Sequence, residues 1–253
     1  MRLFSYIVSI CLFALTTNAQ TKFKPTSETF KNGELVYSVV VHDTEYVGQF
    51  WPIHTVSLVT KQTDKDLFEE DIAKLRQQVQ GVAISPDGMT GDLLMQGKAL
   101  SQGRPCGDGI VYDYGIVYTT SGGNMVFTHK REQQNFDSLY TAVQNTKNSL
   151  FFLPSIFRNG KSLASDKTVE KVFVRRETYA GTQIGVIIFD HLTSYTDAKN
   201  IVLGLDRQGS KTTHIYILDG GPTWGQSCKQ VNGQTVVIGT RNADVVTNYL
   251  VFN

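Results

Sequence analysis

The sequence predicts an α+β fold: a single domain on a mixed, mostly antiparallel β-sheet, with a few helices and one βαβ unit near the C-terminus. Short β-branched and aromatic segments recur along the chain between turns rich in glycine, proline and asparagine. Helical periodicity occurs in only a few stretches. Near the C-terminus, a buried strand, a helix and a second buried strand follow one another. That order predicts a right-handed crossover between parallel strands.

The first residues have the composition of a secretory signal. Arg2 is followed by an apolar run at 3–15, and small residues stand at Thr17 and Ala19. The predicted division of the chain is a signal peptide at 1–19, an N-terminal arm at 20–32 and a globular domain at 33–253. We therefore expect a protein that is exported to the periplasm or secreted.

Charge and hydropathy exclude several classes of partner. The formal net charge is +1, and loss of Arg2 with the signal would leave equal numbers of acidic and basic residues. A neutral surface gives no sign of a nucleic-acid partner. We expect no transmembrane segment, because no stretch has the roughly 20 apolar residues that a spanning helix needs. Cys106 and Cys228 would remain after export, either as a disulfide or as two thiols.

The predicted strands share β-branched and aromatic residues, and most end at a turn signal. In chain order they lie at 35–42, 54–60, two or three places within 110–131, 151–161, 171–176, 183–190, 214–218, 236–239 and 245–252. The segment 48–52 is expected to break the chain between the first two strands, because it contains Gly48 and Pro52.

Three stretches have the period of a helix. Apolar residues at 64–80 fall on one face, with Thr63 as the predicted N-cap. A short helix is expected at 137–148, and a longer one at 194–206 with Gly209 as its stop.

The strand at 214–218 ends in an acidic residue and two glycines, Asp219, Gly220 and Gly221. In α/β architectures, ligands bind near the carboxyl ends of buried strands. The two glycines allow the backbone to approach a ligand closely, and their amides can bind an anion such as a phosphate. The alternative is an ordinary Asp-Gly turn.

Several segments in fixed order carry a family resemblance. They are QIGV at 183–186, the helix at 194–205, LDGG at 218–221, VTNYL at 246–250, FLP through NGK at 152–161 and, more weakly, 83–98. Together they resemble the phosphodiester glycosidase family over residues 80–252. That family includes the lysosomal uncovering enzyme, which removes N-acetylglucosamine from a phosphodiester.

The resemblance implies an exported bacterial hydrolase that cleaves a sugar-1-phosphodiester of the N-acetylglucosamine type in glycan or envelope material. Asp219 and Asp87 are the predicted catalytic carboxylates, with Asp190 in reserve. The predicted substrate-binding residues are Gly220, Gly221, Thr223, Arg175, Arg176 and Trp224. The arginines could instead form ion pairs with Glu177 or Glu170. No cofactor is identified, and a divalent metal stays open, since carboxylate sites leave little trace in a sequence.

The chain departs from the family pattern at three positions. Pro222 separates the Asp-Gly-Gly segment from Thr223, Gly181 stands where the family often has arginine, and Ser85 stands where it favours asparagine. These departures motivate an alternative, a catalytically inactive glycan-binding domain on the same fold. A third reading is a structural envelope protein.

Overall fold

The computed structural model of the chain describes residues 27–31, 34–41, 44–52, 56–60, 82–84, 96–162, 167–218, 227–231, 234–238 and 248–252. The predicted signal segment and the helix expected at 64–80 lie outside these residues. Among the helices that are described, none is long and apolar enough to cross a membrane.

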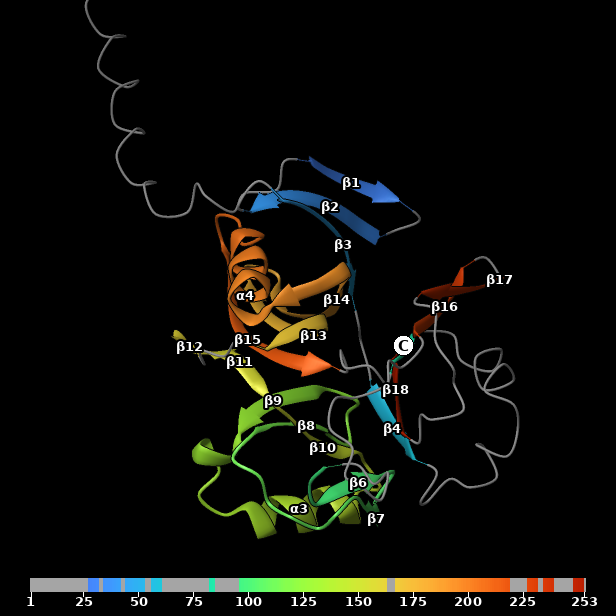
Figure 1. The fold of residues 1–253 in the computed structure, drawn as a ribbon. Coiled ribbons are helices and arrows are strands. Elements are labelled where there is room, and N and C mark those ends of the chain that lie inside the picture. The colour runs from blue at the N-terminus through green and yellow to red at the C-terminus, as the bar shows by residue number, and fades with distance from the viewer. Residues whose placement is uncertain are drawn as a thin grey trace, which may run out of the picture.

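The largest sheet has eight strands, and every neighbouring pair in it is antiparallel. In spatial order the strands are β1 (Ser27–Lys31), β2 (Glu34–Val41), β3 (Thr44–Pro52), β14 (Gly181–Ser194), β13 (Thr168–Thr178), β15 (Ser210–Leu218), β11 (Ser155–Arg158) and β12 (Lys161–Ser162) (Figure 1). The first of these strands falls inside the predicted N-terminal arm and pairs with β2.

The other described strands form two five-stranded antiparallel sheets. One contains β7 (Arg104–Cys106), β6 (Ala99–Ser101), β10 (Leu150–Leu153), β8 (Gly115–Thr119) and β9 (Met125–His129). The other contains β17 (Gln234–Ile238), β16 (Ser227–Val231), β5 (Val82–Ile84), β18 (Asn248–Phe252) and β4 (Val56–Thr60). With helices α3 (Phe136–Asn145) and α4 (Tyr195–Gly204), these sheets confirm the predicted α+β class. Cys106 is a buried thiol at the end of β7.

The predicted βαβ unit is formed by β14, α4 and β15. Both strands pair antiparallel with β13, so they run in the same direction. They are not hydrogen-bonded neighbours as expected, because β13 lies between them. Helix α4 begins where predicted: the Ser194 side chain accepts a hydrogen bond from the Asp197 backbone N–H at 3.1 Å.

In strands β13, β14 and β15, both faces of the eight-stranded sheet are buried. One face packs on α4 through Ala198, Ile201 and Val202. The other face packs on strands of the two smaller sheets, where Phe173 and Tyr216 meet Leu58 and Phe151 among others. Helix α3 covers the far side of the β8–β10 sheet, at the lower edge of Figure 1. The layers are therefore helix, sheet, sheet and helix.

The expected break at 48–52 is wrong, because these residues form the second half of β3. Gly48 pairs with Tyr37 on one side and with Phe189 on the other. Glycine weakens a strand but does not prevent pairing on both edges. Pro52 is the last residue of the strand and lies beyond the pairing with β2, so its missing N–H interrupts no pair on that side.

The chain passes between two sheets at Pro154. β10 ends just before it and β11 begins just after it, so Leu153 and Ser155 belong to different sheets. The predicted turn follows β11: Asn159 and Gly160 have φ values of 45° and 83°, the left-handed conformation of a type I′ hairpin.

Gly115 lies against the ring of Tyr216. A Cβ atom at Gly115 would be 2.5 Å from the Tyr216 ring, which is fully buried. The Tyr216 hydroxyl donates a hydrogen bond to the Thr128 carbonyl at 2.5 Å, so both ends of the side chain are held.

Gly115→Ala should therefore lower the free energy of unfolding by about 1–3 kcal/mol, the cost of overpacking a filled core. Chemical denaturation gives the value if the slope with denaturant is unchanged. Gly122→Ala is the matched control, since its Cβ would come no closer than 3.6 Å to another atom. Equal losses in the two variants would contradict the close approach at Tyr216.

Candidate active site

Strand β15 leads to the predicted catalytic residues. Every residue from His214 to Leu218 is buried, which confirms the predicted strand. Most of the predicted site residues follow this strand: Asp219, Gly220, Gly221, Thr223 and Trp224. These residues and Asp87 lie outside the described part of the chain. The peptide bond alone places the Asp219 Cα about 3.8 Å from that of Leu218.

Lys171 is a buried cation at this end of β15, and the sequence reasoning missed it. Its side chain is 1% exposed, and its backbone is registered opposite Leu218 on one side and Ile188 on the other. A fully buried lysine is rare unless its charge is paired. Alternation could have found it, because position 171 shares a sheet face with Phe173, which is in the core.

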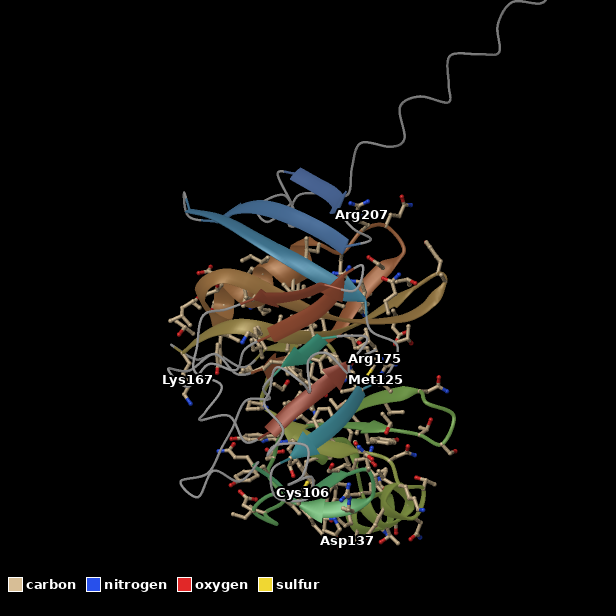
Figure 2. The ribbon with its side chains drawn as sticks, turned by 90° about the vertical axis from the view of Figure 1, so that its right-hand side faces the viewer. Cys106, Met125, Asp137, Lys167, Arg175 and Arg207 are labelled. Atoms are coloured by element: carbon tan, nitrogen blue, oxygen red, sulfur yellow. The ribbon has the colours of Figure 1, made fainter. Side chains whose placement is uncertain are left out.

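Arg175 lies away from this end of the sheet. It is registered opposite His214, four residues before Leu218, a separation of about 13 Å along the strand. Its guanidinium forms an ion pair with Glu177 at 2.6 Å, the alternative role predicted for it. Figure 2 shows Arg175 on the opposite side of the molecule from Lys167, which precedes β13.

Arg176 is part of a buried polar contact that joins β13 to the start of β15. The Asp206 carboxylate forms an ion pair with Arg176 at 3.0 Å, and the two side chains are 8% and 11% exposed. Asp206 also accepts hydrogen bonds from the Thr212 N–H at 2.7 Å and the Thr212 hydroxyl at 2.8 Å. These contacts assign Arg176 a role in the fold.

Asp190 lies on β14 beyond Ile188. Pairing between β13 and β14 is irregular here, since it shifts from Lys171–Ile188 to Val169–Thr193. Asp190 is thus in the irregular part of β14, and its side chain is outside the described part of the structure.

His214, on β15 at a distance from Leu218, has charged residues on both neighbouring strands. His214 lies between Arg158 on β11 and Arg175 on β13. Burial, followed by the Arg175 charge, lowers the pKa of His214 to about 4. Burial also lowers the pKa of His129 and raises that of Tyr216. His214 is therefore neutral at pH 7, and its Nε2 atom has no hydrogen-bond partner in the described residues.

His214 should make the fold sensitive to acid. Its folded-state pKa lies below the value of about 6.5 for an unfolded chain, so the unfolded state binds the proton first. The stability present at pH 7 should fall as the pH drops from about 6.5 toward 4, by about 3 kcal/mol. In His214→Phe, which keeps a ring against Phe127 and Tyr216, that part of the loss should disappear. Urea unfolding at pH 7 and pH 4.5 measures it, and parallel pH curves for variant and wild type would contradict it.

The described residues contain no recognisable metal site. Within them, no three histidine, cysteine, aspartate or glutamate side chains gather closely enough to hold a metal ion. Asp87 and Asp219 lie outside the described ranges.

No protein-family model and no curated protein matches this chain. Among solved structures, it is similar to the zebrafish N-acetylglucosamine-1-phosphodiester α-N-acetylglucosaminidase catalytic domain, auto-inhibited by its pro-peptide. The TM-score is 0.56 at 13% sequence identity, and the match covers 89% of this chain and 80% of that one. The chain therefore has a phosphodiester glycosidase-like fold. This result confirms the fold implied by the sequence resemblance.

Proposed function

We propose that the chain is an exported hydrolase that cleaves the glycosidic bond of a sugar-1-phosphodiester of the N-acetylglucosamine type. The observation that carries the proposal is the phosphodiester glycosidase-like fold, in which the buried strand β15 leads directly into Asp219. A carbohydrate or sugar phosphate is the corresponding substrate class.

The proposed chemistry needs few groups. A phosphate is a good leaving group, so the reaction requires little acid assistance on that side. It does require a carboxylate that acts as nucleophile or base and stabilises positive charge developing on the sugar. We assign that role to Asp219, with Asp87 as the second carboxylate. Carboxylates about 5 Å apart would retain the anomeric configuration, and a wider separation would invert it.

Substrate binding is assigned to the residues after the catalytic aspartate. The amides of Gly220 and Gly221 would hold the phosphate, and Thr223 would add a hydroxyl. Trp224 would stack on a sugar face. Arg175 and Arg176 are left out of this assignment, because the structure pairs each of them with a carboxylate, away from Leu218.

A glycan-binding protein without catalysis is the second candidate, and one observation favours it. Gly181 stands where the family often has arginine, and here it has a φ of +112° in the turn between β13 and β14. That conformation suits glycine and strains an arginine. Hydrolysis by this chain would have to proceed without an arginine at this position.

The purified chain without residues 1–19 should release free N-acetylglucosamine from a synthetic N-acetylglucosamine-1-phosphodiester. A coupled assay for the free sugar measures turnover, and calorimetry with the intact diester measures binding. Binding without release would favour the glycan-binding candidate. If the chain neither releases the sugar nor binds the diester, both candidate functions are contradicted.

A further inference from the structure

A row of three nitrogen-bearing side chains crosses the large sheet at a distance from Leu218. Arg158 on β11 is registered opposite His214 on β15, and His214 is registered opposite Arg175 on β13. Residues in register point to the same face of a sheet, and neighbouring strands are about 4.8 Å apart. His214 therefore lies midway between two arginines whose Cα atoms are about 10 Å apart. The row faces β9, because the Phe127 ring is 6.1 Å from the His214 ring.

Two nitrogen atoms of this row are buried and have no hydrogen-bond partner among the described residues. They are Nη1 of Arg158 and Nε2 of His214. The Arg158 side chain is 14% exposed, and His214 is 3% exposed. A buried polar group without a partner destabilises the fold, and the penalty is larger for a charged group such as a guanidinium. Because Arg158 and His214 are neighbours in register, a single acceptor group can receive hydrogen bonds from both.

The nearby carboxylates bind the two arginines unequally. Arg175 forms its ion pair with Glu177 at 2.6 Å. The Nη1 atom of Arg158 is 3.4 Å from Oε1 of Glu132, well beyond the 2.7–2.9 Å of a charge-assisted hydrogen bond. Glu132 is 37% exposed, and its other oxygen accepts a hydrogen bond from the Thr128 hydroxyl at 3.3 Å. Glu132 is therefore a weak partner for Arg158, and a stronger acceptor can displace it.

The Thr213 hydroxyl determines which nitrogen of His214 carries the proton. Its oxygen is 2.9 Å from Nδ1 of His214 and 3.3 Å from the Arg175 carbonyl oxygen. We assign the hydroxyl proton to the shorter contact, which leaves the ring proton of neutral His214 on Nε2. With a pKa of about 4, the ring is neutral at pH 7. His214 thus offers one buried N–H donor beside the Arg158 guanidinium.

We propose that Arg158 and His214 form a binding site for a small oxyanion such as phosphate, between β9 and the large sheet. The Arg158 guanidinium supplies the positive charge and parallel N–H donors, and His214 adds its Nε2–H. The anion replaces Glu132 beside Arg158. The site lies about 13 Å along β15 from Leu218, so it is distinct from the catalytic residues proposed above. It does not depend on the hydrolase activity.

Calorimetric titration of the purified protein with inorganic phosphate tests the site, with sodium chloride at equal ionic strength as the measure of the general salt effect. The wild type should bind one phosphate. Arg158→Gln should raise the Kd about 10- to 100-fold, the effect of losing a charge-assisted hydrogen bond. His214→Phe should also raise the Kd. Glu132→Gln should lower the Kd several-fold, because it removes a negative charge that repels the anion and competes for Arg158.

Arg131→Gln is the matched control for these variants. Arg131 is in the same short 3-10 helix as Glu132, Lys130–Glu132, but its side chain is 71% exposed and pairs with Asp113. Its loss should leave the Kd for phosphate unchanged. A wild type that binds no phosphate would overturn the proposal. So would binding that Arg158→Gln leaves unchanged, because the anion would then lie elsewhere.

Nuclear magnetic resonance places the anion beside the histidine. In protein labelled with ¹⁵N-histidine at pH 7, the Nε2–H signal of His214 should shift as phosphate is added, and His214→Phe identifies that signal. The shift should saturate at the Kd that calorimetry gives. Phosphate that binds without moving this signal would overturn the role of His214. Hydrolysis of the phosphodiester is measured separately, so failure of the proposed function would leave this result unchanged.

Discussion

Asp219→Asn should lower turnover of an N-acetylglucosamine phosphodiester by about 10²–10⁴-fold, the usual effect of losing a group that acts in acid–base catalysis. Asparagine keeps the size of the side chain and much of its hydrogen bonding, but it cannot carry the negative charge that supports the transition state. Binding of the intact diester should change far less, because we assign the phosphate contacts to Gly220 and Gly221. Steady-state kinetics with a parallel binding measurement separate the two effects.

Asp137→Asn is the matched control for this prediction. Asp137 is 83% exposed on α3 and pairs with Lys98, so the change removes one carboxylate away from β15. Its turnover should equal that of the wild type. If Asp219→Asn instead keeps normal turnover and loses thermal stability, Asp219 only shapes a turn, and the chemistry would pass to Asp87 or Asp190.

Asp206→Asn should have the largest effect on stability, a loss of about 3–5 kcal/mol in the free energy of unfolding. The variant takes the negative charge away from Arg176, whose side chain is 8% exposed. It also disturbs the two hydrogen bonds from Thr212 that hold the start of β15. Chemical denaturation measures the loss.

Glu177→Gln is the comparison that isolates burial as the cause. The variant breaks the Arg175–Glu177 ion pair, which at 2.6 Å is shorter than the Arg176–Asp206 pair. The Arg175 and Glu177 side chains are, however, 27% and 42% exposed. Water screens such a pair, so the loss should not exceed about 1 kcal/mol. Similar losses for the two variants would mean that burial does not set the strength of these contacts.

Local sequence patterns predicted most of the described elements. The β-branched strand at 214–218, the helix expected from Ser194 and the Asn159–Gly160 turn all depend on neighbouring residues, and the structure has all three. The pattern misled at β3, where Gly48 was read as a break. Pairing with β2 and β14 on both edges holds that strand together, and a local pattern does not contain those partners.

Residue roles in the site depended on non-local pairing. The sequence predicts a crossover from β14 to β15, but nothing in it places β13 between them. That placement brings Lys171 beside Leu218 and puts Arg175 opposite His214. The position of Lys171 at the end of β15 and the separation of Arg175 from that end follow from this register.

The isotopic course of hydrolysis tests the central claim most directly. The chain would act on an N-acetylglucosamine-1-phosphodiester in water enriched in ¹⁸O, and ³¹P nuclear magnetic resonance would examine the phosphate product. A glycosidase breaks the bond between the sugar carbon and oxygen, so the phosphomonoester should contain no ¹⁸O. One ¹⁸O atom in the phosphomonoester would show attack at phosphorus and would contradict the glycosidase assignment.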